Sequence, residues 1–221
     1  VCDDATVHGP EETPIALPEI MSMLTDVDGS EDLMVTIAAI PDGVEISDGN
    51  GNTFTASPGN NSVDVTGWKL DNLSIIAPVG SEDFDLTVEA KATESSNNDT
   101  ATSTGTITVD IIHAPTTADE TVTTLEDVSY TFKEADFVFN DVDGDNAAFV
   151  TITTLPSNGV LKIGADDVVI GNNNEIAIAD IDNLVFIPDE NESADSHTAF
   201  NFTITDDGVV PLTSEVQTLT I

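Results

Sequence analysis

The sequence predicts an all-β protein made of two tandem antiparallel Greek-key β-sandwiches. Short runs such as FNFTIT (200–205) and DLTVEA (85–90) alternate apolar with polar residues, and Gly, Asn, Asp or Pro bounds them. The segment DVDGSEDLMVTIAAIP at 26–41 also recurs as DVDGDNAAFVTITTLP at 141–156. About seven short strands per roughly 100 residues, separated by turn signals, is the spacing of a β-sandwich.

The repeat extends along most of the chain at an offset of 115 residues, so that Glu11 and Glu12 correspond to Glu126 and Asp127. With small gaps, LDNLSIIAP (70–78) matches IDNLVFIP (181–188), and DFDLTVEA (83–90) matches AFNFTITD (199–206). Matches in the same order indicate a duplicated domain. The expected organisation is a linker at 1–10, a sandwich at 11–112, a Pro/Thr-rich linker at 113–120 and a second sandwich at 121–221.

Charge is the strongest feature of the composition. The chain has 42 acidic residues against four lysines and no arginine, a formal net charge of -38. Nucleic acids and anionic lipids require cationic side chains, so we expect neither as a partner. No apolar run is long enough to span a bilayer, and a single cysteine excludes a disulfide framework. A compact state this negative repels itself unless salt screens it or cations bind it, so we expect bound divalent cations or a saline environment.

The acidic residues gather in loops, and loop oxygens are the ligands that Ca²⁺ prefers. The DVDG loop is not an EF-hand, because that motif requires Gly at position 6 and Glu at position 12. Here Gly is fourth, and Ile37 and Ile152 stand at the twelfth positions. A different arrangement of ligands is therefore expected.

Topology predicts where the acids meet. We call the end of a sandwich at which the chain enters proximal and the other end distal. With strands counted from residue 11, the first loop and the fifth loop lie at the distal end, whereas the start of the first strand and the sixth loop lie at the proximal end. The candidate ligands are Asp26, Asp28, Asp141, Asp143 and Asp145 in the first loops, Glu11, Glu12, Glu126 and Asp127 at the strand starts, Asp206 and Asp207 in the sixth loop, and Asp119 in the linker. Facing acids are then expected to share Ca²⁺ between consecutive sandwiches.

These residues resemble a known family. The run EDVSYTFKEADFVFNDVDGDNAAFVTITTLPSNGVLKIGADDVVI, continuing through IDNLVFIPDENESADSHTAFNFTITDDG, is similar to the cadherin-like repeats of giant bacterial RTX adhesins, which type I systems secrete. The first unit, with TDVDGSEDLMVTIAAIPDGVEI and LDNLSIIAP, resembles the Ig-like repeats of the same proteins. The resemblance covers about residues 11–221 and is moderately specific in combination.

The resemblance implies a calcium-stiffened extender module at the bacterial cell surface, which projects or flanks a ligand-binding domain for attachment and biofilm formation. Its partners would be neighbouring domains of the same chain and a host, algal or biofilm surface ligand, with the chain itself a monomer. By position it implies seven calcium ligands: Glu126, Asp127, Asp141, Asp143, Asp145, Asp206 and Asp207. The first unit departs from the motif, since it has VEAKATESSNND where the second has TDDG.

Two functions other than an extender module are a ligand-binding module and an enzyme. The fragment itself could be a calcium-dependent module that binds a peptide or glycan, for which Trp68 and Tyr130 are the candidate platforms. Ice is a further possible ligand, but we expect no regular Thr-x-Thr ladder that would present a flat face to it. An enzyme is not expected, because His8 and His113 fall in linker-like segments and His197 in an acidic loop.

Overall fold

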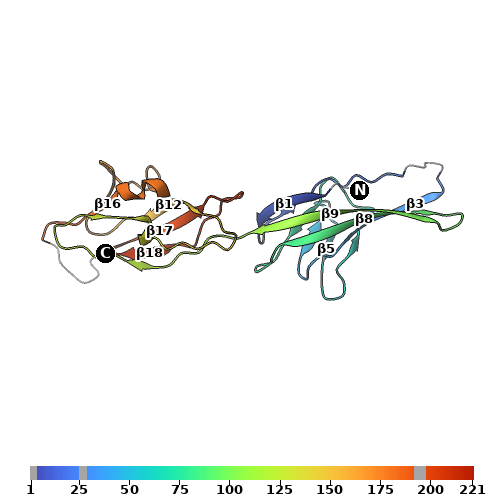
Figure 1. Cartoon of the computed structure of the whole chain (residues 1–221), viewed down its shortest axis with the longest axis horizontal. Coiled ribbons are helices and arrows are strands. Elements are labelled where there is room, and N and C mark those ends of the chain that lie inside the picture. The colour runs from blue at the N-terminus through green and yellow to red at the C-terminus, as the bar shows by residue number, and fades with distance from the viewer. Residues whose placement is uncertain (1–3, 25–28, 192–197) are drawn as a thin grey trace. The chain divides into compact units, whose positions relative to one another are not determined.

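The computed structural model describes residues 4–24, 29–191 and 198–221, and the chain divides into two compact units, Val1–Ile112 and His113–Ile221. Each unit is a β-sandwich, which confirms the predicted fold class (Figure 1). Asp26, Asp28 and His197 lie outside the described residues.

The first unit contains nine strands in two sheets. The strands are β1 (Ala5–Pro10), β2 (Ile15–Ala16), β3 (Glu31–Ala38), β4 (Glu45–Ser47), β5 (Thr53–Thr55), β6 (Val63–Asp64), β7 (Ser74–Ile76), β8 (Phe84–Glu94) and β9 (Thr100–Ile112). One sheet has the order β1-β9-β8-β3-β6 and the other β2-β7-β4-β5. β8 pairs antiparallel with both β3 and β9, whereas β1 pairs with β9 in parallel.

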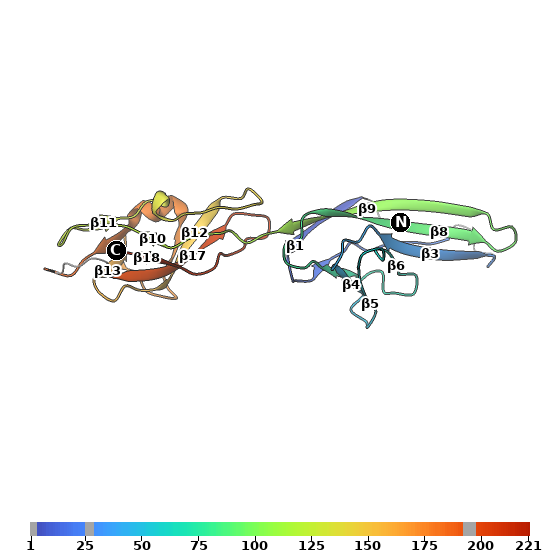
Figure 2. The same ribbon diagram turned by 90° about the horizontal axis from the view of Figure 1, so that it is seen from below.

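The second unit repeats this arrangement. It contains β10 (Glu120–Thr121), β11 (Tyr130–Thr131), the 3-10 helix η1 (Glu134–Asp136), β12 (Ala147–Thr154), β13 (Val160–Ile163), β14 (Asp166–Asp167), β15 (Glu175–Ala177), the 3-10 helix η2 (Ile178–Asn183), β16 (Leu184–Ile187), β17 (Ala199–Asp206) and β18 (Gln217–Thr220). Its sheets have the orders β10-β18-β17-β12-β15 and β11-β16-β13-β14. Figure 2 shows β10, β18, β17 and β12 of the first of these sheets. The two units therefore share one topology, strand for strand.

Local backbone geometry repeats as well. Glu12 and Asp127, which the sequence places in register, both have positive φ, at 55° and 59°. Asp4 and Asp119 stand in register too, and each accepts a backbone N–H from the last strand of its unit, from Thr106 at 2.9 Å and from Thr218 at 2.8 Å. The duplication read from the sequence thus extends to individual turns and hydrogen bonds.

Strand pairing begins earlier in each unit than the sequence analysis assumed. Residues 5–10, expected to be a linker, form β1, which pairs with Ile107–Ile112 of β9. In the segment expected to be the second linker, Thr116 pairs with Asn140, and β10 begins at Glu120 beside β18. Neither segment has a long alternating pattern, because an edge strand that pairs on one side needs few buried side chains.

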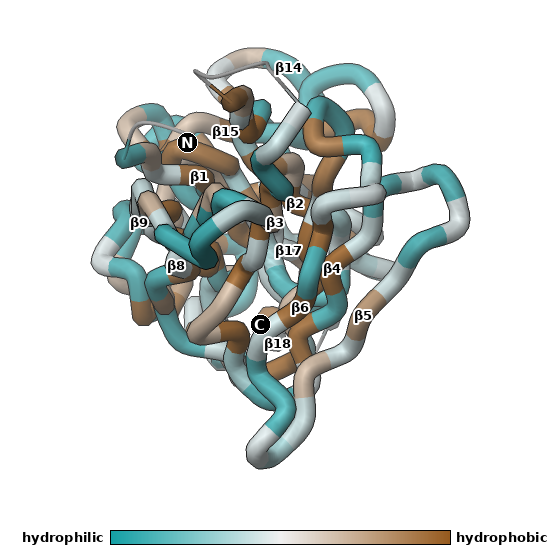
Figure 3. The backbone as a smooth tube through the Cα atoms, turned by 90° about the vertical axis from the view of Figure 1, so that its right-hand side faces the viewer, coloured by the Kyte–Doolittle hydropathy of each residue, from teal (hydrophilic) through white to brown (hydrophobic). Residues whose placement is uncertain are grey.

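The core of each unit lies between its two sheets. In the first unit Ile37 and Leu86 from one sheet meet Ile46 and Ile75 from the other, and all four are fully buried. In the second unit the core is aromatic, and the rings of Phe132 and Phe200 meet edge to face with centroids 5.5 Å apart. Figure 3 shows hydrophobic residues along the strands and hydrophilic residues in the outer loops. Among the described residues, no helix has the length and hydrophobicity needed to cross a bilayer.

Candidate metal centre

Three carboxylates come together in the loop that leads into β12. Asp141, Asp143 and Asp145 each offer an oxygen, and these oxygens lie within 4.8 Å of one another. The loop can close on itself because Gly144 has a φ of +87°, which is open to glycine, and because Asp141 Oδ1 accepts the N–H of Asp143 at 2.8 Å. The short DVDGD sequence is thus sufficient to gather three acids on one small loop.

Two further acids reach the same place from the end of β17. Ala147, at the start of β12, stands opposite Asp206 in the sheet, so the loop before β12 and the loop after β17 share one end of the sandwich. Asp207 donates its N–H to the carbonyl of Asn146 at 2.9 Å and accepts the N–H of Asn146 at 2.8 Å. This pair of bonds fixes the two acidic loops to each other.

Negative charge dominates the electrostatics around Asp145. Burial raises the pKa of Asp145, and the negative charges of four neighbouring carboxylates raise it further. Those neighbours are Asp141, Asp206, Asp207 and Asp143. Asp145 therefore holds its negative charge at a cost in free energy, and a cation placed beside it would remove that cost.

One buried carboxylate oxygen of the cluster has no hydrogen-bond partner in the protein. Oδ2 of Asp141 is buried and accepts no hydrogen bond, although a buried carboxylate oxygen normally has a partner. Asp206, which is 1% exposed, is instead held by the N–H groups of Gly208 and Leu212, at 3.1 Å each. Asp143 accepts the N–H of His113 at 2.6 Å and contacts the ring of His113 at 2.9 Å.

Gly208 leaves room for these carboxylates. A Cβ built on this residue would overlap Oδ2 of Asp145, and it would lie 3.3 Å from Oδ1 of Asp206. The site is thus a cradle of carboxylate oxygens that includes an orphaned buried oxygen, and such a set of hard oxygen donors fits Ca²⁺. The residues that could hold the ion are Asp141, Asp143 and Asp145, with Asp206 and Asp207 beside them.

The structure does not bring the other predicted ligands into this cluster. Glu126 and Asp127 form a turn at the distal end of the second unit, where Asp127 accepts the N–H of Asn191 at 3.0 Å. Glu11 and Glu12 form the equivalent turn of the first unit, where Glu11 accepts the N–H of Gly80 at 2.6 Å. Asp119 lies on the surface and bonds to Thr218. Whether these acids bind a metal stays a prediction, as it does for Asp26 and Asp28.

The predicted ends of the sandwich were partly wrong. The first loop was placed at the distal end and the strand starts at the proximal end, but the second unit shows the reverse. Asp145 lies beside Asp206, and Asp127 lies beside Asn191. The cause is the missed strand at the start of each unit. With this strand added, the turn that follows it lies at the distal end, and the first loop lies at the proximal end.

The sequence analysis did not single out Asp48. Asp48 is 1% exposed and organises the turn between β4 and β5. It accepts the side-chain amide of Asn52 at 2.7 Å and the backbone N–H groups of Asn50 and Lys69. Burial alone would raise the pKa of Asp48, but the hydrogen bonds from Asn52, Asn50 and Lys69 lower it to about 2. The signal in the sequence was an Asp followed by two Gly-Asn pairs, which is typical of an Asx turn.

The candidate platforms and histidines are engaged with other groups. Trp68 is half-buried against the core of the first unit. Tyr130 packs on the second core and donates its hydroxyl to Asp136 at 3.0 Å. His8 pairs with Asp110 at 2.7 Å, and His113 contacts Asp143. Sequence reasoning also missed a ladder of threonines at alternate positions of β9, from Thr100 to Thr108, all on one face of that strand.

Comparison with known proteins adds little. No family model matches the chain, and no curated protein sequence matches it. Among solved structures, Drosophila N-cadherin EC1-4 is 15% identical with a TM-score of 0.40, and the match covers 98% of this chain and 47% of that one. Human protocadherin-24 EC1-2 is 10% identical with a TM-score of 0.40, covering 99% and 93%.

The extracellular domain of protocadherin GammaB4 is 12% identical with a TM-score of 0.36, and the match covers 99% of this chain and 33% of that one. The chain therefore spans less than half of the N-cadherin and GammaB4 structures. Likenesses this distant carry no argument about function. The fold assignment rests on the sheet orders and cores of the chain itself.

Proposed function

We propose that this chain is a calcium-binding, non-enzymatic spacer of an extracellular adhesion protein, an extender module that projects or flanks a ligand-binding domain. The observation that carries the proposal is the cluster of Asp141, Asp143 and Asp145, with its orphaned buried oxygen. The resemblance of the sequence to the repeats of type I secreted RTX adhesins supports a bacterial cell surface as the location and attachment or biofilm formation as the role.

The residues of the cluster would have different roles in binding the ion. Asp141, with its unpartnered buried Oδ2, and Asp145, with its raised pKa, are the two carboxylates most in need of a positive charge. Asn146 and Asp207 hold the two loops together through one backbone hydrogen bond and one from the N–H of Asn146 to the side chain of Asp207, and Gly208 keeps the space open. A bound Ca²⁺ would supply the positive charge that offsets the mutual repulsion of the carboxylates.

The cluster also involves the residue with which the second unit begins. Asp143 accepts two contacts from His113, and His113 directly follows Ile112, the last residue of β9. Ordering the acidic loop would therefore restrain His113. We propose that this restraint reduces bending between the units and makes the segment stiffer in Ca²⁺.

Thermal unfolding of the full chain in Ca²⁺ and in chelator tests the proposal, with small-angle scattering for extension. Extracellular calcium sites have dissociation constants of about 10⁻⁴ to 10⁻³ M, so 10 mM Ca²⁺ should stabilise the second unit by roughly 1 to 3 kcal/mol. For a unit of this size the shift in Tm should be roughly 5 to 15 °C. Sodium chloride at matched ionic strength controls for charge screening.

Variants assign the effect to the cluster. Asp145→Asn should lose most of the calcium-dependent shift in Tm, whereas Asp180→Asn, an exposed acid of η2 outside the cluster, should keep it. An unchanged Tm for the parent chain in Ca²⁺ would refute calcium binding. A raised Tm with an unchanged maximum dimension would refute stiffening and leave binding intact.

A further inference from the structure

The hairpin of β8 and β9 leaves part of one strand edge open. β9 pairs with β8 from Thr100 to Val109, but it pairs with β1 only from Ile107 to Ile112. Among the described residues, no strand therefore lies beside Thr100–Thr106 on the side that β1 occupies further along. This stretch is the free edge of β9.

The backbone groups of the free edge point outward. Thr106 donates its N–H to the side chain of Asp4 on the β1 side, and Ile111 donates its N–H to Asp83 on the β8 side. Because backbone direction alternates along a strand, the N–H and C=O groups of Thr100, Thr102 and Thr104 face away from β8. Residues 100–104 are all exposed.

The free edge lacks the features that normally block strand addition. Natural edge strands carry lysine, proline, a bulge or an inward charge, or are very short. The run TATSTGTITV at 100–109 has no charged residue and no proline, in a chain with 42 acidic residues, and its pairing with β8 has no register shift. The described pairing of β1 begins at Ala5, and at Thr106 the side chain of Asp4 takes the hydrogen bond that a backbone carbonyl would take in a longer ladder.

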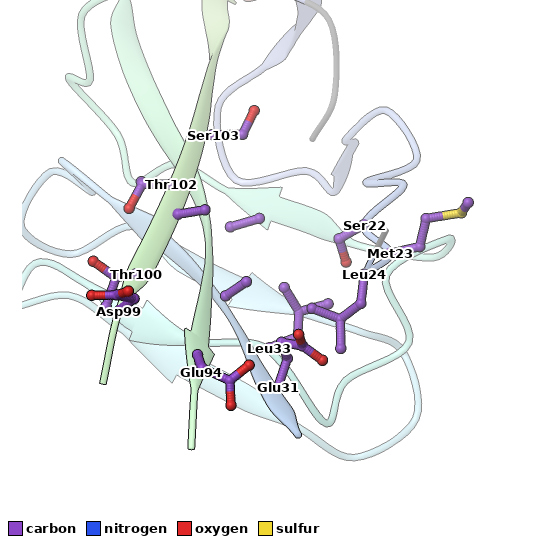
Figure 4. A pocket seen from close by; sticks show the side chains of 13 residues that line it. Ser22, Met23, Leu24, Glu31, Leu33, Glu94, Asp99, Thr100, Thr102 and Ser103 are labelled. Atoms are coloured by element: carbon purple, nitrogen blue, oxygen red, sulfur yellow. The ribbon is translucent and has the colours of Figure 1, made fainter. Parts of the chain in front are cut away.

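A groove lies beside the free edge on the inner face of the same hairpin (Figure 4). Its volume is about 450 Å³, and Leu24, Leu33, Ala90 and Ala92 form its apolar part. Glu31 and Glu94, which are paired across β3 and β8, add negative charge, as does Asp99. The groove thus combines an apolar wall with three carboxylates.

We propose that the free edge of β9 binds an extended basic segment of another polypeptide by strand addition, with a Lys or Arg side chain in the groove. The apolar stem of such a side chain would lie along Leu24 and Leu33, and its charged head would meet Glu31 and Glu94. A second copy of this chain is a poor occupant, because two chains of net charge -38 repel each other. This peptide site is independent of the calcium role.

Fluorescence anisotropy with three labelled ten-residue peptides tests the proposal on the full chain. The first alternates Val and Thr around two lysines, the second has Glu in place of Lys, and the third has Lys but a central Pro. We expect saturable binding of the lysine peptide, at least tenfold weaker binding of the glutamate peptide, and no binding of the proline peptide. Absence of saturable binding of the lysine peptide at millimolar concentration would overturn the proposal.

Variants separate backbone pairing from other contacts. Thr102→Pro removes an edge N–H that no described strand uses. The variant should therefore keep the fold and bind the lysine peptide at least tenfold more weakly than the parent does. Thr102→Val keeps the N–H and should bind as the parent does. Glu94→Gln should lower the affinity for the lysine peptide several-fold. Equal binding by the Pro and Val variants would refute strand addition. Binding only after deletion of residues 1–4 would show that the chain's own start occupies the edge, which also refutes the proposal.

Discussion

Replacing Gly208 with alanine perturbs the candidate calcium site without changing any charge. Gly208 follows Asp206 and Asp207. Its φ is not positive, so its backbone conformation is open to alanine. The added Cβ would overlap Oδ2 of Asp145 and lie 3.0 Å from Cγ of Asp145. The substitution therefore acts by contact, mainly on the carboxylate of Asp145 and more weakly on Oδ1 of Asp206, which would lie 3.3 Å from the added Cβ.

The size of the effect follows from the geometry. Non-bonded heavy atoms pack at about 3.5 Å or more, so the carboxylate of Asp145 must move by about 1 Å. Calcium to oxygen distances lie within about 2.3 to 2.6 Å, and a displacement of that size removes a ligand. We expect a tenfold to hundredfold loss of calcium affinity, which corresponds to about 1.4 to 2.7 kcal/mol.

Isothermal titration of Ca²⁺ into the chelator-treated full chain measures the loss. Gly67→Ala in the first unit is the matched control, because its Cβ would meet no atom within 4 Å, and it should bind Ca²⁺ as the parent does. Circular dichroism checks that both variants fold. Parental affinity in a folded Gly208→Ala variant would show that Asp145 is not a ligand and would refute the assigned geometry.

Three further predictions concern stability. Phe200→Ala should cost roughly 3 to 5 kcal/mol in a urea titration, since the fully buried ring packs on Phe132, and a cost under about 1 kcal/mol would contradict the core assignment. Gly159→Ala should lower the stability of the second unit by more than about 1 kcal/mol, because Gly159 has a φ of +75° and its Cβ would lie 2.5 Å from the ring of Phe186; an unchanged Tm would contradict this. The pKa of Asp48 is lowered to about 2 from 3.8, so its stabilising contribution is present above about pH 4 and is lost as the pH falls through about 2. Acid unfolding followed by the fluorescence of Trp68 should show this loss in the parent and not in Asp48→Asn, and identical acid limbs would refute it.

The duplicated β-sandwich could be predicted from the sequence alone. Alternation of apolar residues places Ile37, Leu86 and Phe200 inward, and Gly, Asn and Asp mark the turns, because both signals are local. The matched positions Glu12 and Asp127 have nearly the same backbone conformation, which the repeat alone implied. Local chemistry and internal repetition therefore carry most of the fold.

The positions of loops in space were harder to predict. Periodicity identifies a strand but not its neighbours, and the short edge strand β1 has no strong apolar pattern. Missing it reversed the predicted ends for the first loop and for Glu126 and Asp127. The DVDGD loop itself was recognised, whereas its meeting with Asp206 and Asp207 at one end depends on the pairing of β12 with β17.

Other features depend on which polar groups form hydrogen bonds in the folded chain, and this cannot be read from the sequence. The buried role of Asp48 arises from four hydrogen bonds that converge only in the folded turn. The threonine ladder of β9 was visible as alternating residues from Thr100 to Thr108. Its open edge, however, depends on where β1 stops, at Ala5.

The most direct test of the calcium site is a site-resolved titration of the full chain by amide NMR at fixed ionic strength. If Ca²⁺ binds at the cluster, saturable shifts should concentrate at Asp141–Asn146, at Asp206–Gly208 and at His113, with one dissociation constant for all three. The exposed Asp180 of η2 should show only a weak, unsaturated shift. Shifts of equal size and midpoint at all acidic loops would mean that Ca²⁺ is only a diffuse counterion, and that result would contradict the account.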